Sequence, residues 1–318
     1  DYRAQSRAVH THCQPSGAFR GFGVPQSAIA QETAFDLLAE KLGMDALEFR
    51  VKNALGDWVR TVCGQVFSQG VGIRQCLEAL RPAWNAAKAE CAAFNDQNSA
   101  VKRGVGLASA WYGCGNTSLP NPSTIKAGLR RDGTIVLHQG AMDIGQGSNT
   151  VIPQIFAKAL GVPVSDITVV GADTDITPDA GKTSASRQTF VSGNAALRAG
   201  EALRADILRQ VNAGPTAQII AKDHRINVSD GPHSQTLDLE RLSPDDQGYV
   251  LMAQETYDPP VKPLDENGQG EPYAQFGYAA QLAVVEVDIA LGLCKPLRFV
   301  AAHDVGRAIN PLLVEGQV

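Results

Sequence analysis

The sequence predicts an α+β fold, in which helices and mixed sheets form separate blocks along the chain. Two observations carry this prediction. Apolar side chains recur at helical spacing over much of residues 27–94, whereas from residue 104 onward short strand-like segments are separated by turns. Two later helical segments interrupt the strands without a strict strand–helix–strand repeat. A doubly wound parallel sheet is therefore disfavoured, and the 318 residues are enough for about two domains.

The first block is expected to contain three helices. Residues 27–42 place their apolar side chains at helical spacing, and a glycine follows them. Asp45 and Glu48 are three residues apart and resemble a capping box, which starts the second helix. The third helix is expected over residues 73–94, kinked or divided at Pro82.

The second block is expected to consist mainly of strands. Asp132 and Gly133 predict a hairpin turn between strands at 124–130 and 135–139. Prolines, glycines and charges over residues 259–272 predict an exposed loop. The remaining strands are expected at 104–112, 167–170, 279–289 and 295–303, and the remaining helices at 148–160 and 191–211.

The composition excludes several functional classes. The net charge is −5 with both signs scattered along the chain, which leaves no basic face for nucleic acid. Apolar runs are far shorter than the ~20 residues that a membrane span needs. The six cysteines are widely spaced with no Cys-x-x-Cys pair, so most are expected to be buried thiols. A cytoplasmic location is expected, with the periplasm as the alternative.

Three loops carry glycines or hydroxyl groups in a pattern that suits a ligand. The first, residues 17–26, places glycines around Phe19 and Phe22 just before a helix that Pro25 helps to start. Glycines let backbone amides approach a ligand closely. The alternative interpretation is a tight loop with two phenylalanines in the core.

The second loop, residues 143–150, holds a Gly-Gln-Gly turn that opens a helix. Amides at a helix N-terminus favour anions such as phosphate. Thr150 stands where the dinucleotide fingerprint has its third glycine, so a nicotinamide-dinucleotide site is disfavoured. The alternative is a turn followed by an ordinary helix cap.

The third loop, residues 181–189, is rich in hydroxyl side chains and carries two cations ahead of a long helix. Such a loop can hold a second anionic group. The alternative is a solvated entry to the helix, with Arg187 in water.

The candidate protein-metal sites are weak. His10, His12 and Cys13 share ligand chemistry suited to zinc or copper, but no second cluster follows at the spacing of a structural zinc site. Residues 173–179 hold three aspartates, yet Pro178 and the missing final acidic ligand break the calcium-loop pattern. No set of metal-ligating side chains is therefore predicted.

Four motifs, taken in order, closely resemble the xanthine dehydrogenase and aldehyde oxidase family of molybdenum hydroxylases. They are Phe19-Arg20-Gly21-Phe22-Gly23-x-Pro25-Gln26, Gly145-Gln146-Gly147, Thr183-Ser184-Ala185-Ser186 and Asn310-Pro311-x₄-Gly316-Gln317. The resemblance covers essentially the whole chain. It implies the fold of the molybdenum-cofactor-binding domain, with residues 1–100 as the helical end of a first subdomain and residues 101–318 as a second subdomain, truncated at its C-terminus.

The resemblance also implies roles for the motif residues. In that family, molybdenum is held by the dithiolene sulfurs of a pyranopterin and not by side chains. The backbone of the first motif is expected near the metal, with Arg20 and Phe22 at the reacting centre and Phe22 as an aromatic wall for the substrate. The cofactor-binding residues that the resemblance implies are Phe19, Arg20, Gly21, Gly145, Gln146, Gly147, Ser184, Ala185, Ser186 and Gln317.

The implied activity is that of an aldehyde oxidoreductase, which forms carboxylic acids with water as the oxygen source. Residues 111–123 look most like bacterial aldehyde oxidoreductases with a molybdopterin cytosine dinucleotide. The alternatives are a hydroxylase of N-heterocycles and a cofactor-binding fragment without catalysis of its own.

The implied partners are 2Fe-2S clusters and FAD in other domains or subunits, an aldehyde substrate and a homodimer. A general-base glutamate is expected after Val318 in a Val-Gly-Glu motif, so the 318 residues alone are expected to be inactive.

Overall fold

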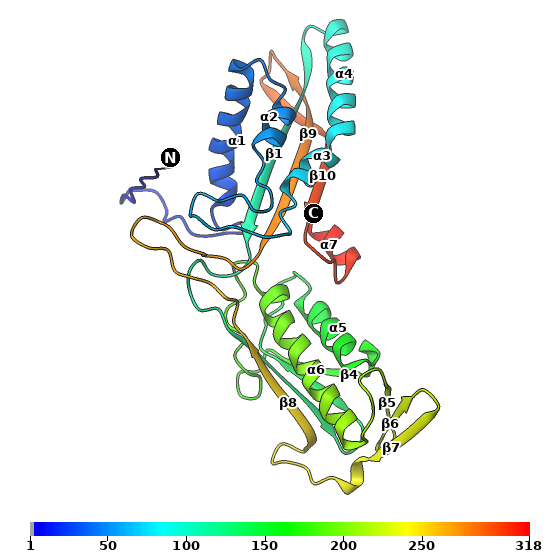
Figure 1. Ribbon diagram of the computed structural model, residues 1–318. Coiled ribbons are helices and arrows are strands. Elements are labelled where there is room, and N and C mark those ends of the chain that lie inside the picture. Colours follow the sequence, from blue (N-terminus) through cyan, green and yellow to red (C-terminus); the bar gives the residue numbers. More distant parts are fainter. Residues whose placement is uncertain (1–2) are drawn as a thin grey trace. The chain divides into compact units, whose positions relative to one another are not determined.

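The structure is a computed structural model that describes residues 3–318. The chain forms two compact units that interleave along the sequence (Figure 1). Unit 1 comprises the residues up to Gly113 together with Lys262–Arg307, and unit 2 comprises Cys114–Val261 together with Ala308–Val318. Both units combine helices with sheets, which confirms the predicted α+β class. The predicted division into subdomains at residue 100 stays a prediction.

Unit 1 is built on a three-stranded antiparallel sheet in the order β1-β9-β10. Its core joins apolar residues of the helices, such as Leu77 and Trp84, to sheet residues such as Leu282. The elements are α1 (Val24–Lys41), α2 (Ala46–Asn53), α3 (Ile73–Ala79), α4 (Arg81–Gln97), β1 (Val101–Gly113), β9 (Phe276–Asp288) and β10 (Leu293–Asp304).

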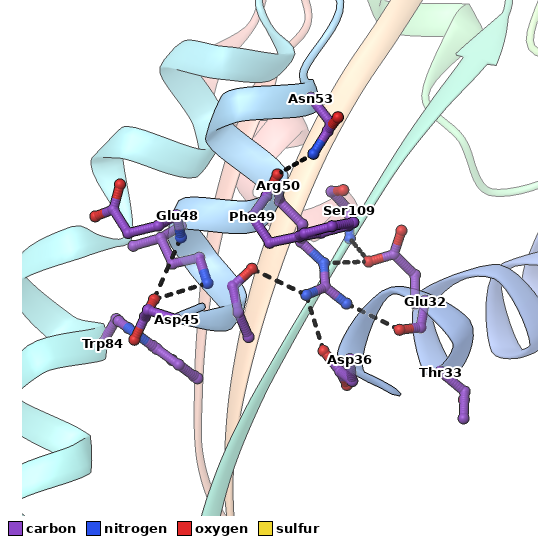
Figure 2. Close-up of polar contacts among 12 residues, drawn as sticks. Glu32, Thr33, Asp36, Asp45, Glu48, Phe49, Arg50, Asn53, Trp84 and Ser109 are labelled. Atoms are coloured by element: carbon purple, nitrogen blue, oxygen red, sulfur yellow. Dashed lines mark hydrogen bonds and ion pairs between the residues drawn. The ribbon is translucent and has the colours of Figure 1, made fainter. Parts of the chain in front are cut away.

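Local signals set the helix boundaries in unit 1. The Asp45 carboxylate accepts the amides of Leu47 and Glu48, at 2.9 and 3.3 Å, and so caps α2 as the sequence predicts (Figure 2). The predicted third helix is divided at Leu80, and Pro82 occupies the first turn of α4. A proline lacks the amide that a helix interior needs, but a first turn does not need it.

Unit 2 holds a four-stranded mixed sheet in the order β4-β3-β2-β8 and a three-stranded antiparallel sheet in the order β5-β6-β7. The helices α5 and α6 pack against each other, and both contribute to the core of the unit (Figure 1). The elements are β2 (Ser123–Arg130), β3 (Ile135–Gln139), α5 (Ser148–Leu160), η1 (Val164–Asp166), β4 (Ile167–Gly171), η2 (Gln188–Ser192), α6 (Gly193–Gln210), β5 (Gln218–Lys222), β6 (Arg225–Asp230), β7 (His233–Asp238), η3 (Leu239–Arg241), β8 (Tyr249–Tyr257) and α7 (Pro311–Gln317).

The connection from β3 through α5 to β4 positions the functional loops of unit 2. β3 and β4 are parallel neighbours, so the ends of both strands meet at one edge of the sheet, where α5 begins. The hairpin predicted at Asp132 and Gly133 joins β2 to β3. The strands β5 to β8 and the short helix α7 were not predicted from the sequence.

The prediction that the cysteines are mostly buried is wrong. Only Cys76 and Cys91 are buried among the six, all of which are free thiols. Cys76 lies in the core of unit 1, where it packs as a small apolar side chain, and burial raises the pKa of its thiol. Among residues 3–318, no helix is both long and apolar enough to cross a membrane.

Candidate functional site

The first glycine-rich loop lies in unit 1 and leads directly into α1. Gly21, Phe22 and Gly23 have φ angles of 98°, 51° and 94°, so three successive residues adopt the left-handed region. That conformation is costly for a side chain as large as phenylalanine. The exposed fractions of Phe19 and Phe22 are 61% and 65%, which contradicts the alternative of two core phenylalanines.

The Gly-Gln-Gly turn of unit 2 is organised by a carboxylate that sequence reasoning did not single out. Asp143 accepts the amides of Gly145 at 2.8 Å, Gly147 at 3.3 Å and Asn149 at 2.9 Å. These bonds lower the pKa of Asp143, led by the one from Asn149 and against a smaller effect of burial. The first turn of α5 thus already has an anion on part of its amides. The pattern of aspartate followed by glycines is the signal that would have predicted such a turn.

The glycines of this turn meet two different surroundings. Gly145 has a φ of 101° and open space where a Cβ would stand. A Cβ on Gly147, which caps α5, would lie 3.0 Å from the Leu313 side chain of α7. The side chain of Gln146 is held within its own loop, since it accepts the Ile144 amide at 2.6 Å and donates to the Met142 carbonyl at 3.0 Å.

The helix α7 packs beside the start of α5. Its cap residue Asn310 accepts the amide of Leu313 at 3.1 Å and donates to Gln154 of α5 at 3.4 Å. Gln317 is the last residue of α7. Unit 2 therefore brings the second and fourth motifs into one neighbourhood.

The hydroxyl-rich loop joins the same neighbourhood. Thr183 donates its hydroxyl to the Met142 carbonyl at 2.9 Å, just before the Gly-Gln-Gly turn. Ala185 and Ser186 have φ angles of 55° and 53°. Two successive left-handed residues that are not glycine cost about 1–2 kcal/mol each. Strain of this kind is typical of ligand-binding segments.

Arg187, directly after these two residues, is enclosed rather than solvated. Its exposed fraction is 1%, which contradicts the alternative that placed it in water. The Nε atom donates to Asn121 Oδ1 at 2.6 Å. The Nη2 atom donates to the backbone carbonyls of Asn121 at 2.7 Å and Pro122 at 2.6 Å. The Nη1 atom donates to the carbonyls of Ala180 and, at 3.3 Å, Lys182. Burial lowers its pKa, and the charges of Asp179 and Asp258 partly oppose that effect.

A chain of buried hydrogen bonds supports the loop from behind. Gln188 donates to Thr183 Oγ1 at 3.2 Å and accepts the hydroxyl of Ser192, which lies 2.7 Å from the hydroxyl of Ser123 at the start of β2. Gln188 and Ser192 belong to η2, a π-helical turn of five residues. Such turns occur frequently at functional sites.

A cavity of about 260 Å³ opens beside the Gly-Gln-Gly turn. Residues of three segments line it, namely Ala141, Met142 and Asp143, then Asn149, and then Val169, Gly171 and Ala172 at the end of β4. Gln139 is fully buried next to it and donates to Asn149 Oδ1 at 2.7 Å. Its Oε1 atom has no hydrogen-bond partner in the described part of the chain. Gln139 does not itself line the cavity, and a buried acceptor without a partner is uncommon in a folded protein.

The weaker metal candidates do not assemble. His10, His12 and Cys13 are exposed in unit 1. Asp173 and Asp179 accept amides of their own turns, from Asp175 at 3.0 Å and Gly181 at 2.7 Å. Within residues 3–318, no three histidine, cysteine or acidic side chains gather as a metal site would require.

Comparison with known proteins identifies the family of the chain. A family model described as a molybdopterin cofactor-binding domain matches residues 78–318, and a second model with the same description matches residues 1–54. The chain belongs to this family. It is the family of xanthine dehydrogenase and aldehyde oxidase that the four motifs resemble.

Individual relatives agree with the assignment. The putative xanthine dehydrogenase molybdenum-binding subunit of Escherichia coli is 33% identical over the whole chain, which covers 42% of that protein. The aldehyde oxidoreductase of Megalodesulfovibrio gigas is 30% identical over 99% of the chain and 32% of its own length. The crystal structure of the aldehyde oxidoreductase of Desulfovibrio desulfuricans superposes with a TM-score of 0.78 at 28% identity, over 94% of this chain and 30% of that one. The chain thus spans less than half the length of these relatives.

The residues of unit 2 fit a molybdopterin cofactor. The strained backbone at Ala185 and Ser186, the open face of Gly145 and the orphan acceptor of Gln139 all lie in the neighbourhood of residues 139–149 and 180–186. Backbone amides, hydroxyls and small residues are the groups that approach a phosphate and a polar ring edge closely. Arg20 and Phe22 belong to unit 1, and their roles stay predictions.

Proposed function

We propose that this chain is the molybdenum-cofactor-binding part of an aldehyde oxidoreductase. The observation that carries the proposal is the convergence in unit 2 of the Gly-Gln-Gly turn, the strained pair Ala185 and Ser186, and the cavity beside Asn149. When bound, the cofactor supplies a redox-active metal that oxidises the substrate with water as the oxygen source. The protein residues bind it, orient it and exclude water.

Each motif has a part in this proposal. The backbone of residues 184–186 faces the pterin and the metal ligands, and residues 145–147 bind the pterin and its phosphate through their amides. Gln317 hydrogen-bonds the pterin ring. Phe19, Arg20 and Gly21 contribute backbone groups near the metal, and the exposed ring of Phe22 serves as the wall of the substrate pocket.

The nucleotide form of the cofactor is proposed to be the cytosine dinucleotide. The cavity of about 260 Å³ beside the turn gives room for a group attached to the phosphate. Iron–sulfur clusters, with or without FAD, in other domains or subunits would accept the electrons.

The substrate class rests on the end of β1 and the residues that follow it. Residues 111–119 carry no charged side chain, which suits an aldehyde better than a purine, whose ring edges need polar partners. A second candidate is hydroxylation of an N-heterocycle, because the relative from Escherichia coli is named as part of a xanthine dehydrogenase and is 33% identical over the whole chain.

One experiment tests both parts of the proposal. The protein is purified with any neighbouring domains or subunits from a host that makes molybdenum cofactors, and molybdenum and released cytidine monophosphate are counted per chain. Dye reduction is then followed with benzaldehyde and with xanthine. Bound molybdenum with aldehyde-dependent reduction supports the proposal. Xanthine-dependent reduction alone supports the second candidate, and molybdenum without either activity supports a non-catalytic cofactor-binding role.

A further inference from the structure

Arg187 is unusual among the buried charges of the described chain. Of the side chains that are less than 2% exposed it is the largest, and none of the ion pairs found among residues 3–318 includes it. All of its hydrogen bonds go to neutral oxygens, four of them backbone carbonyls. A buried charge that makes no ion pair is costly unless its donors are all satisfied, and the charges of Asp179 and Asp258 act on Arg187 only from beyond ion-pair distance. The protein keeps the charge by turning backbone dipoles toward it.

The five hydrogen bonds join two segments that are about 60 residues apart in sequence. Asn121 and Pro122 lie in the connection between β1 and β2, while Ala180 and Lys182 lie immediately before the hydroxyl-rich loop. The loop closes tightly on the guanidinium, since a Cβ on Gly181 would stand 2.6 Å from Nη1. Only a planar fork with five N–H groups can hold all of these carbonyls at once.

The same segments hold the strained residues at the far end of the loop. The Ala185 carbonyl accepts the amide of Gly115 at 2.8 Å, in the connection that also contains Asn121. The loop is therefore fixed at both ends. The Arg187 side chain binds the carbonyls of Ala180 and Lys182 at its start, and the Gly115 amide binds the carbonyl of Ala185, which with Ser186 adopts the left-handed region, at its end. A loop held in this shape before ligand binding avoids the entropy cost of ordering it afterwards.

We propose that Arg187 is a positioning residue that presets residues 180–186 for the anionic cofactor. This inference rests on the proposed function of the loop. The fork geometry of the guanidinium sets the backbone shape, and its charge, which no carboxylate hydrogen-bonds, favours a phosphate-bearing ligand nearby. A lysine would keep the charge but could not hold all the carbonyls.

Arg204 of α6 provides a matched control. It also donates only to backbone carbonyls, those of Leu160 at 2.8 Å, Pro215 at 3.0 Å and Ala217, and a Cβ on Gly161 would likewise meet its Nη1 atom. Replacement by glutamine therefore removes the same kind of carbonyl cage at either arginine. Only Arg187 lies on the proposed cofactor loop.

The test compares Arg187→Gln, Arg187→Lys and Arg204→Gln in the intact protein. Hydrogen exchange of the peptide covering residues 180–186, in protein made without molybdenum, is expected to rise at least about tenfold in both Arg187 variants and to stay unchanged in Arg204→Gln. In molybdenum-loaded protein, both Arg187 variants are expected to lose molybdenum about 10- to 100-fold faster than the wild type, as for other residues that support a metal site indirectly. Any molybdenum they retain is expected to give an altered paramagnetic resonance signal on reduction.

The outcomes separate this inference from the proposed function. Normal exchange and normal molybdenum retention in Arg187→Gln overturn the inference, and full rescue by Arg187→Lys overturns the role of the fork. A wild-type protein that never holds molybdenum overturns the proposed function, while the exchange measurement still decides whether Arg187 fixes the loop. If Arg187→Gln does not fold, Asn121→Ala removes the acceptor of Nε, which also accepts the Asn116 side-chain amide at 3.2 Å, and leaves the four carbonyl acceptors of Arg187 in place. It is expected to loosen the same peptide to a smaller extent.

Discussion

Two buried arginines, one in each unit, satisfy their charges in opposite ways. In unit 1, Arg50 of α2 meets carboxylates, with Nε 2.7 Å from Glu32 Oε2 and Nη1 2.8 Å from Asp36 Oδ1 (Figure 2). In unit 2, Arg187 meets carbonyls and one amide oxygen. An acid in each unit differs in the same sense, because the buried Glu32 binds a cation whereas the half-buried Asp143 binds backbone amides.

This difference separates an ion pair that holds packed elements together from a charge that sets the shape of a loop. Arg50 and Glu32 neutralise each other, and Glu32 also accepts the amide of Ser109, so the pair fixes α1 and α2 against β1. Charges held by backbone dipoles keep their net charge and at the same time fix the shape of a loop. Asp143 and Arg187 are charges of this second kind beside the proposed cofactor loops, and Arg204 is one that lies away from them.

The largest effect on stability is expected at Arg50. Arg50→Met leaves Glu32 buried without its cation, and breaking a buried pair in this way costs about 3–5 kcal/mol. The measurement is urea unfolding followed by tryptophan fluorescence. All three tryptophans, Trp58, Trp84 and Trp111, lie in unit 1, so this signal reports on unit 1 alone.

A double variant sharpens the same prediction. Replacing both partners, as Glu32→Leu with Arg50→Met, is expected to recover most of the lost stability, because no uncompensated charge then remains. Molybdenum content is expected to survive in the double variant. A double variant less stable than Arg50→Met would show that the pair does more than neutralise charge.

A smaller effect, confined to one loop, is expected at Asp143. Asp143→Asn weakens three hydrogen bonds to the turn and the first turn of α5, and loss of a side-chain acceptor at a helix N-terminus typically costs about 1 kcal/mol. Hydrogen exchange of residues 144–150 is expected to rise while the tryptophan signal of unit 1 stays unchanged. Asp173→Asn is the control, since Asp173 accepts the amide of Asp175 within its own turn.

The pH dependence of that loop gives a second measurement. The amide bonds from Asn149, Gly145 and Gly147 lower the pKa of Asp143 in the folded protein. A lowered pKa contributes stability that is present above the unfolded value of about 3.9 and is lost as the pH falls through the folded value. In the wild type, the protection of residues 144–150 from hydrogen exchange should therefore persist just below pH ~3.9 and be lost as the pH falls further. In Asp143→Asn, which has no carboxylate to protonate, this pH-dependent loss should be absent.

The comparison also explains what the sequence could predict. Local signals were sufficient where one residue determines the structure near it, as for the cap at Asp45, the division at Pro82 and the turn at Asp132 and Gly133. The strand β7 was missed because its side chains are mostly exposed and show no alternation. The packed, strand-forming residues of β2 and β3, by contrast, were predicted closely.

The site was only partly predictable for a similar reason. The motifs indicated which loops matter, but the burial of Arg187 depends on carbonyls contributed by a segment about 60 residues away. No spacing rule connects them. The orphan acceptor of Gln139 likewise depends on how β3, α5 and β4 pack around it. Considered one loop at a time, the sequence left open a solvated Arg187 and a core position for Phe19 and Phe22, and the structure contradicts both alternatives.

The smallest effect is expected at Lys88, which pairs with a carboxylate as Arg50 does, but at the surface. Its Nζ lies 2.6 Å from Asp45 Oδ2, and half of its side chain is exposed, so Lys88→Met should cost only about 0.2–1 kcal/mol. Burial raises the pKa of Asp45, but hydrogen bonds from Lys88, Trp84 and the backbone outweigh it and lower the pKa.

That pKa gives the sign of the effect. The lowered pKa stabilises unit 1 above the unfolded value of about 3.9, and this contribution is lost as the pH falls through the folded value. Lys88→Met removes one of the lowering bonds, so its cost, read from tryptophan-detected urea unfolding, should be present at pH 7 and shrink towards pH 3. Solvent should screen the charge of Lys88, and Asp45 should still cap α2 without it. A cost at pH 7 as large as that of Arg50→Met would therefore contradict the distinction between buried and exposed pairs.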